Sequence, residues 1–200
     1  MLTAIRHGDT QFNKGKERLR GWLPIPLSKE GMQHAMDTAK YLKKISLVDS
    51  SKPILTSDLP RAVQTAHEIA GELGTNIEPR SELRDWNVGI YTGKSADETL
   101  SQVHHYIDNP DKKIPEGESY NEYYNRIFPL IKSLTESSDM NTIISHNRTM
   151  TLIHALTRSK GSAPSINDLK QKGPVEPGGL MVISPEWDTI FSDKFGKSYV

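Results

Sequence analysis

The segment Arg6-His7-Gly8-Asp9-Thr10, followed by Asn13, contains residue types suited to phosphoryl transfer. A neutral imidazole can attack phosphorus and divide one difficult displacement into two steps through a phosphohistidine. A neighbouring arginine favours the neutral ring and can pair with phosphate oxygens through its planar guanidinium, and Gly8 would let the backbone approach the ligand. His7 is therefore a candidate nucleophile and Arg6 a candidate phosphate ligand. An Arg-His-Gly tripeptide alone also arises by chance.

Two further positive or donor groups follow at a distance in the sequence. Arg61 comes shortly after Ser57-Asp58, and His146 follows Thr142 to Ser145. Phosphoryl transfer needs several such groups around three equatorial oxygens. A single surface arginine or core-edge histidine is the commoner case for each, but all three groups fall at predicted strand ends or helix starts.

The predicted elements would bring these groups together. Short apolar runs at residues 2–5, 53–56 and 142–145 read as buried strands, and each stops where a polar cluster begins. In an open, largely parallel sheet, ligands bind just outside the carboxyl ends of the strands. We therefore expect the three clusters to share one pocket.

The rest of the chain alternates helix and strand signals. Helices are predicted over residues 28–44, from a cap at Ser57 or Asp58 to about residue 73, and over 96–107, 120–134 and 150–156, with final strands at 180–184 and 188–192. Residues 78–93 have no clear period and form a candidate active-site loop. Because no repeat or linker interrupts the pattern, we expect one α/β domain.

Composition excludes several classes of function. The 25 Lys and Arg residues balance 25 Asp and Glu residues, so no global field favours nucleic acid or an anionic membrane as a partner. No stretch reaches the roughly 18 apolar residues of a membrane span, and a cytoplasmic protein with a small phosphorylated substrate is expected. The absence of cysteine excludes a thiol nucleophile, disulfides and thiolate metal sites. Oligomeric state stays open.

Taken together, these segments resemble the histidine phosphatase superfamily, also called the phosphoglycerate mutase-like family. The matching segments are Arg6 to Asn13, Arg18 to Gly31, Thr56 to Ala66 and Ser145-His146, with weaker matches at Leu83 to Gly93 and at Pro115 to Ser119 with Arg126. The resemblance covers nearly the whole chain. It implies a three-layer α/β/α fold with a mostly parallel central sheet, formed by a single domain over residues 1–200.

The resemblance also implies roles for individual residues. The histidine matching His7 is phosphorylated in the family, and no metal or other cofactor is required. The phosphate is held by residues that match Arg6, Asn13, Arg18, Arg61 and His146.

A carboxylic acid in the family's central loop protonates the leaving oxygen. Aligning Leu83 and Gly89 with that loop places Asp85 at this position, as general acid and later as general base. The family position is usually glutamate, so the shorter Asp85 must sit closer or act through water. Glu82, three residues earlier, is the alternative.

The residues after the acid favour one branch of the family. The mutase branch resembles Arg-His-Tyr there, whereas this chain has Trp86, Asn87 and Val88, and the segment between Gly93 and Pro115 is too short for that branch's insertion. A phosphomonoesterase hydrolysing a small phosphorylated metabolite is the leading hypothesis. A phosphoglycerate mutase-type phosphotransferase and a catalytically weak phospho-ligand binding module are the alternatives.

Aromatic residues in the irregular loops are candidates for the pocket beyond the phosphate. These are Trp22, Trp86 and Tyr91. His104 and His105 could suggest a metal site, but neighbours on a helix point about 100° apart, so both are interpreted as surface residues.

Overall fold

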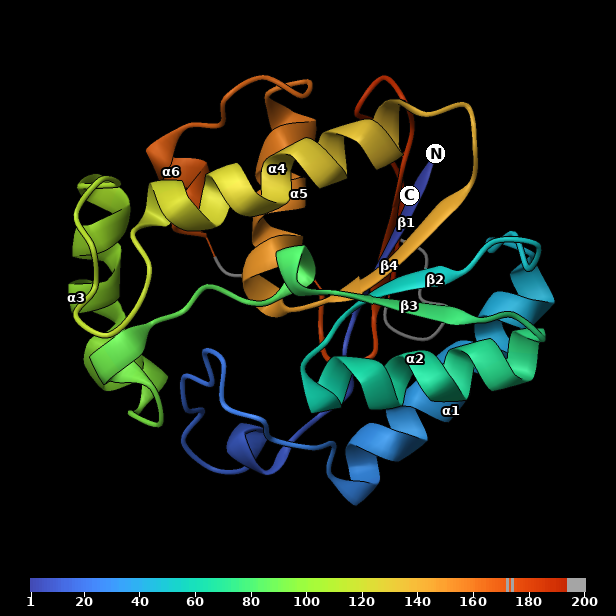
Figure 1. The fold of residues 1–200 in the computed structure, drawn as a ribbon, viewed down its shortest axis with the longest axis horizontal. Coiled ribbons are helices and arrows are strands. Elements are labelled where there is room, and N and C mark those ends of the chain that lie inside the picture. The colour runs from blue at the N-terminus through green and yellow to red at the C-terminus, as the bar shows by residue number, and fades with distance from the viewer. Residues whose placement is uncertain (172, 174, 194–200) are drawn as a thin grey trace.

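A six-stranded sheet forms the centre of the computed structural model, which describes residues 1–171, 173 and 175–193 (Figure 1). Its strands are β1 (Leu2–Arg6), β2 (Ile54–Ser57), β3 (Ile77–Arg80), β4 (Asn141–Ser145), β5 (Leu180–Ile183) and β6 (Thr189–Asp193), in the spatial order β3-β2-β4-β1-β5-β6. Strands β3, β2, β4 and β1 pair in parallel with one another in this order, and β5 pairs antiparallel with both β1 and β6. The mostly parallel sheet is as predicted.

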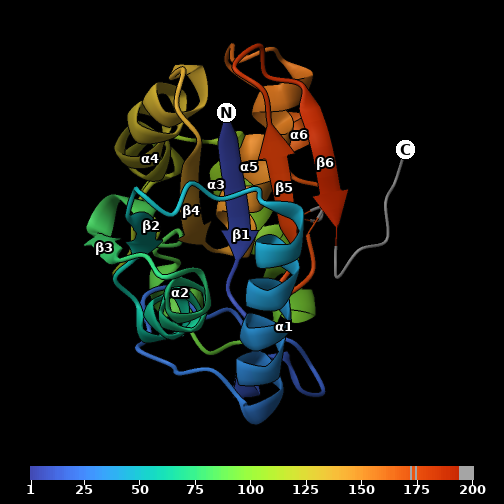
Figure 2. The same ribbon diagram turned by 90° about the vertical axis from the view of Figure 1, so that its right-hand side faces the viewer.

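Helices cover both faces of this sheet. Helices α1 (Lys29–Ile45) and α2 (Pro60–Leu73) lie together on one face, and α3 (Ala96–Asp108), α4 (Tyr120–Glu136), α5 (Asn147–Arg158) and the short α6 (Ile166–Leu169) gather on the other (Figures 1 and 2). Three short 3-10 helices, η1 (Gln11–Asn13), η2 (Ser81–Leu83) and η3 (Gly89–Tyr91), lie in the connecting loops. This arrangement confirms the three-layer α/β/α prediction.

Alternation along the strands divides the core into two layers. Leu2 and Ala4 of β1 pack with the residues of α3, α4 and α5, whereas Ile5 packs with those of α1 and α2. Successive side chains of a strand point to opposite faces, so a fully buried strand must be apolar at both parities. This requirement explains why the inner strands read as continuous apolar runs. Within the described residues, no helix is long and apolar enough to cross a membrane.

Two sequence predictions about local structure were wrong. The N-cap of α2 is Leu59, with Pro60 in the first turn, and neither Ser57 nor Asp58 occupies the cap position. Strand β3 falls inside the segment that was expected to be irregular. Its sequence includes Pro79, which cannot donate to a ladder and is tolerated because β3 is an edge strand.

The sheet places the polar clusters at one end. Strands β1 and β4 are parallel neighbours with Arg6 opposite Ser145, so the residues that follow them, His7 and His146, leave the sheet side by side. Gly8 has a packing role that the sequence did not indicate. A Cβ atom there would lie 2.3 Å from the carbonyl oxygen of Gly31 in α1, so only glycine fits this contact.

Candidate active site

His7 is held in one tautomer at the end of β1. Its backbone N–H donates to the Ser145 carbonyl at 3.0 Å, and its Nδ1 lies 2.7 Å from the Gly8 carbonyl oxygen. A carbonyl oxygen only accepts, so Nδ1 carries the proton of the neutral ring. The Nε2 atom is then unprotonated, which is the form required of a nitrogen nucleophile.

His146 is fixed in the opposite sense by two partners. The Nε atom of Arg61 donates to His146 Nδ1 at 3.3 Å, and His146 Nε2 lies 2.8 Å from the hydroxyl oxygen of Ser57. In its neutral form this ring therefore carries its proton on Nε2 and acts as a donor. The centroids of the His7 and His146 rings are 5.1 Å apart, with the ring planes at 63°, so the two imidazoles are direct neighbours.

Three arginines are buried around these histidines. Arg61 is fully buried, Arg6 is 5% exposed and Arg20 is 8% exposed. Arg61 donates to the carbonyls of Leu23 and Gly21, at 2.9 Å each, so it is held rigidly.

Two of the three guanidiniums have unused donors. Arg6 donates through Nη1 to the Val175 carbonyl at 2.9 Å, and Arg20 donates through Nε to the Thr10 hydroxyl at 2.9 Å. Arg6 Nε and Arg20 Nη2 are buried with no hydrogen-bond partner in residues 1–171, 173 and 175–193. A buried donor without an acceptor costs about 1 to 3 kcal/mol, more when it is charged. An anion bound in this space would supply the missing acceptors.

The electrostatic field of the site keeps both rings neutral. Burial, reinforced by Arg61, Arg20 and Arg6, holds the pKa of His7 well below its ordinary value. Burial and the same Arg61 charge hold the pKa of His146 well below its ordinary value too. Desolvation lowers the pKa of Arg61 itself to about 10, so its guanidinium stays protonated at neutral pH.

Asp85 lies beside this cluster. It lines a pocket with Arg20 and Gly21, and its Oδ1 accepts from the Trp86 backbone N–H at 3.0 Å. Burial raises the pKa of Asp85, opposed first by the charge of Arg61 and then by that of Arg148. A carboxyl group with a raised pKa beside a phosphate-sized cluster of donors suits a general acid.

An ion pair holds the backbone on which Asp85 sits. Arg126 of α4 pairs with both oxygens of Glu118 at 3.0 Å, and its Nη2 also donates to the Asp85 carbonyl at 3.2 Å. Arg126 Nη1 donates to the carbonyls of Ser81, Glu82 and Arg84. One side chain therefore fixes four carbonyls of the segment that carries the acid.

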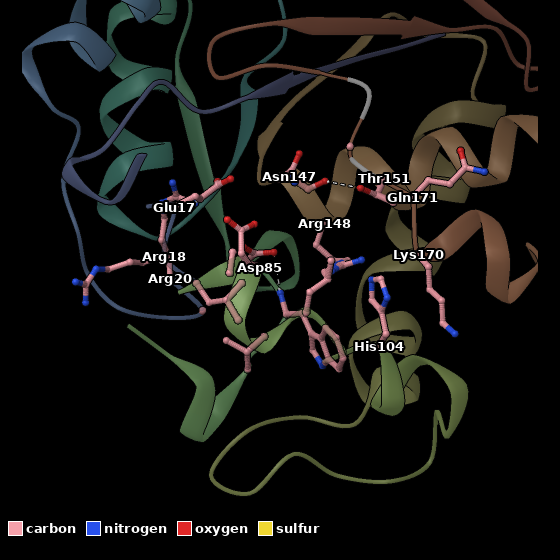
Figure 3. Close-up of a pocket in the computed structure, with 18 residues that line it drawn as sticks. Glu17, Arg18, Arg20, Asp85, His104, Asn147, Arg148, Thr151, Lys170 and Gln171 are labelled. Carbon is pink, nitrogen blue, oxygen red and sulfur yellow. Dashed lines mark hydrogen bonds and ion pairs between the residues drawn. The ribbon is translucent and has the colours of Figure 1, made fainter. Parts of the chain in front are cut away.

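The other predicted site residues have different partners, and Asn13 is linked to the cluster through Thr10, whose hydroxyl accepts from Arg20. Arg18 is exposed at the rim of the pocket and donates to the Gly93 carbonyl at 3.1 Å, pointing away from the remaining side chains (Figure 3). Asn13 accepts from the backbone and hydroxyl of Thr10 and forms a capping box at η1. Glu82 lies in η2, with its nearest hydrogen-bond donor the Ser81 hydroxyl at 3.4 Å. Asp85, and not Glu82, lines the pocket.

Comparisons with known proteins identify the family of the chain. The family model of the histidine phosphatase superfamily (branch 1) matches residues 2–171. The chain belongs to this superfamily. A protein of Escherichia coli O1:K1 named "Probable phosphoglycerate mutase GpmB" is 32% identical over 134 residues, which span 64% of this chain and 60% of that protein.

Several solved structures share the fold. A mycobacterial glucosyl-3-phosphoglycerate phosphatase, solved in complex with VO3, is 25% identical, covers 90% of each chain and gives a TM-score of 0.68. A protein of Thermus thermophilus gives a TM-score of 0.69 at 23% identity, with 96% of this chain and 97% of that one covered. This superfamily member thus has both phosphatase and mutase relatives.

The sequence alone did not indicate the positions of several residues around His7, His146 and Asp85 in this superfamily member. Arg20, not Arg18, is the buried arginine of its segment, and Ser57 contacts His146 rather than capping a helix. The Glu118–Arg126 pair was present only as a weak family match, with no role. The sequence signal for Arg20 was weak. Arg20 lies two residues after Arg18 in the same short segment, and this spacing does not show which of the two is buried.

A pocket of about 400 Å³ extends from Asp85 toward α5, α6 and α3 (Figure 3). Trp86 forms part of its wall, as expected, whereas Tyr91 packs against Tyr106 and Trp22 donates its indole N–H to the Asp85 carbonyl at 2.8 Å. His105 is exposed, as predicted, and His104 is half-buried and lines the pocket. Within the part of the chain that the structure describes, no group of three or more His, Asp or Glu side chains is placed to hold a metal ion.

Proposed function

We propose that this protein is a phosphomonoesterase that hydrolyses a small phosphorylated metabolite through a phosphohistidine on His7, without a metal. One observation carries the proposal: the unprotonated Nε2 of His7 lies among three buried arginines, two of which have donors with no partner among the described residues. Such a site stabilises charge on the phosphoryl oxygens and offers a nucleophile to the phosphorus atom.

In the first step, Nε2 of His7 attacks the phosphorus atom and forms a P–N bond while the ester P–O bond breaks. Arg6, Arg20 and Arg61 stabilise the negative charge on the phosphoryl oxygens, and the Nε2–H of His146 exchanges the Ser57 hydroxyl for one of these oxygens. The leaving oxygen takes its proton from Asp85, whose raised pKa keeps a protonated fraction available. The alcohol then departs, and Asp85 is left as a carboxylate.

In the second step, water attacks the phosphohistidine. The Asp85 carboxylate takes a proton from the water as its oxygen bonds to phosphorus, and the P–N bond breaks. Inorganic phosphate leaves, Asp85 is protonated again, and His7 returns to its neutral form. Atoms and protons balance over the cycle with one water consumed.

The mutase alternative rests on the name of the Escherichia coli relative. The match covers only 60% of the length of that protein. A mutase must retain the phosphate and return it to a second oxygen of the same ligand. Interconversion of 2-phosphoglycerate and 3-phosphoglycerate without release of inorganic phosphate would favour this alternative.

The test is a phosphatase assay in EDTA with p-nitrophenyl phosphate and a panel of phosphorylated metabolites, run on wild type and His7→Ala. We expect wild type to release inorganic phosphate and His7→Ala to lose at least about 10³-fold in kcat, as removal of a covalent nucleophile does. An inert wild type would leave the phospho-ligand binding module as the better description.

A further inference from the structure

The pocket beside Asp85 has a wall that the proposed hydrolysis does not use. Arg148 of α5, His104 of α3 and Lys170, which follows α6, line the side of the pocket opposite Glu17 and Arg20 (Figure 3). These three side chains come from three separate elements and line one side of the same pocket. We name them the far wall.

Arg148 is the centre of the far wall. Its Nη1 donates to the Leu169 carbonyl at 3.0 Å, and its Cζ lies 5.8 Å from the centroid of the buried Trp86 ring. The hydrogen bond uses one of its five N–H donors, so the guanidinium is oriented while most of its donor edge stays available. In Figure 3 it is drawn between Asp85 and His104. Its charge lowers the pKa of both groups, which supports this placement.

Three acidic residues line the pocket, and within the described residues none of them forms an ion pair with Arg148. Burial raises the pKa of Asp85, the one that senses the charge of Arg148. Glu17 lies at the other end, 3.5 Å from Arg20 and 3.8 Å from Arg6, and Asp97 is an exposed residue at the edge. Lys170 forms an ion pair with Asp108 outside the pocket lining. The far wall therefore presents a partly buried arginine, an amine and an imidazole, and carries net positive charge.

We propose that the substrate carries a second acidic group, a carboxylate or a second phosphate, and that Arg148 binds it with Lys170 and His104 while the transferred phosphate lies at His7. The inference rests on the proposed function, because it takes the bound molecule to be the substrate of that reaction. Its physical basis is that a planar guanidinium binds a carboxylate or phosphate through two parallel hydrogen bonds. The pocket of about 400 Å³ has the size of a small-metabolite site, and one ligand in it can contact Arg20 and Asp85 at one end and Arg148 at the other.

The experiment compares matched pairs of phosphoesters that differ only in the second group. The pairs are 4-carboxyphenyl phosphate against 4-carbamoylphenyl phosphate, 3-phosphoglycerate against glycerol 3-phosphate, and glucose 1,6-bisphosphate against glucose 6-phosphate. The first two pairs test a carboxylate at two distances, and the third tests a second phosphate. The readout is the ratio of kcat/KM for the acidic member to that for the neutral member.

We expect wild type to prefer the acidic member of at least one pair by about tenfold or more, which corresponds to roughly 1.4 kcal/mol. Arg148→Gln should bring the ratio close to one. Arg148→Lys, which keeps the charge but not the planar fork, should retain part of the preference.

A matched control lies on the same helix. Arg158 pairs with Asp168 at 3.1 Å and does not line the pocket, so Arg158→Gln removes an equal charge from α5 and should leave the ratio unchanged. A preference that survives in Arg148→Gln, or that falls equally in Arg158→Gln, would overturn the inference. Thermal unfolding of each variant shows whether it is folded.

Binding to His7→Ala separates this inference from the proposed function. Calorimetric titration of the same pairs needs no turnover. Acid-dependent binding that Arg148→Gln abolishes would support the far wall even if wild type hydrolysed nothing, in which case only the phosphatase proposal fails. Equal binding and equal turnover of acidic and neutral members would overturn the far wall and leave hydrolysis at His7 intact.

Discussion

The hydrogen bond from His7 Nδ1 to the Gly8 carbonyl determines which nitrogen of the ring can react. With the proton fixed on Nδ1, the lone pair of Nε2 is free at any pH above the ring's own pKa. Burial and three arginines hold that pKa well below its ordinary value. The nucleophile therefore remains competent in mildly acidic solution, where an exposed histidine would be charged.

The pH profile should report Asp85. As general acid it must be protonated, so kcat/KM should fall as pH rises through its raised pKa, while the lowered pKa of His7 moves the acidic limb to low pH. We expect an optimum below pH 7. Asp85→Asn should lose the alkaline limb and about 10²-fold in rate on alkyl phosphates. The loss should be smaller on p-nitrophenyl phosphate, whose leaving group needs no proton.

Two comparisons isolate the carboxyl in this profile. The substrate phosphate titrates near pH 6, so its limb appears in wild type and Asp85→Asn alike. Glu82→Gln should leave the profile unchanged. If Glu82→Gln, rather than Asp85→Asn, removed the alkaline limb, the assignment of the acid would be wrong.

The two arginines of the Arg18 to Arg20 segment should differ sharply in their effects. Arg20→Gln removes a buried guanidinium with a free Nη2 donor, and we expect a loss of about 10²-fold in kcat/KM, typical of a donor aimed at developing charge. Arg18→Gln removes an exposed one and should change kcat/KM by less than about threefold. Steady-state kinetics on p-nitrophenyl phosphate measures both, and equal losses would contradict the placement of Arg20.

The sequence could not distinguish these two arginines. Both lie in a loop, one on each side of Leu19, and a loop has no period from which burial can be inferred. His7, Arg6 and Arg61 were predictable because each follows or begins a regular element. Asp85 came from the family alignment, and its half-buried environment could be known only from the packing of α4.

At the scale of elements, strand ends position the nucleophile and a helix positions the acid. The register of β1 with β4 sets His7 beside His146, and Ser57 at the end of β2 reaches His146 Nε2. Asp85 lies on an irregular segment, and the segment is ordered by Arg126 of α4. The Glu118–Arg126 ion pair thus contributes to the order of this loop, together with the Trp22 hydrogen bond to Asp85 and the Arg84–Asp58 ion pair.

Breaking this pair should affect catalysis through position. In Glu118→Gln, Arg126 loses its partner and the Asn87 N–H loses its carboxylate acceptor, so we expect a loss of about 2 kcal/mol in the free energy of unfolding. The rate constant kcat should fall while KM changes little, because the phosphate ligands stay in place. Chemical denaturation and steady-state kinetics measure these effects.

A surface pair supplies the control. Lys113→Gln breaks an exposed ion pair with Glu122 and should change the free energy of unfolding by less than about 0.5 kcal/mol. A rise in KM without a fall in kcat for Glu118→Gln would contradict a positioning role for the pair.

The elements themselves were largely predictable, and the exceptions have physical causes. Strong apolar periods identified α1, whose Ser28 cap was also predicted, and the inner strands. Strand β3 was missed because Glu78, Pro79 and Arg80 give it neither an apolar run nor an alternation, and it joins the described sheet by pairing with β2. Pairing partners are a property of the fold, which the local sequence does not encode.

For the whole molecule, three buried arginines in a chain of zero net charge should lower the stability of the protein when no anion is bound. Unpartnered cationic donors destabilise the free protein, and an anion that binds only the folded state should restore the loss. Vanadate at 100 times its Kd would add about 2.7 kcal/mol. For a chain of this size we expect a rise in Tm of roughly 5 to 10 °C.

The rise in Tm caused by vanadate should depend on the buried arginines. Arg20→Gln should have a smaller shift in Tm with vanadate at the same concentration, and Arg158→Gln should keep the full shift. Differential scanning fluorimetry provides the measurement, and an equal shift in Arg20→Gln would mean that the anion binds elsewhere.

The most direct test of the account is to trap the covalent intermediate. Wild type is mixed with p-nitrophenyl phosphate, quenched in base within milliseconds and digested for mass spectrometry, because a phosphoramidate survives base and is lost in acid. We predict phosphate on the peptide that contains His7, absent from His7→Ala and accumulating in Asp85→Asn. Turnover without any phosphate on His7, or phosphate on another residue, would contradict the account.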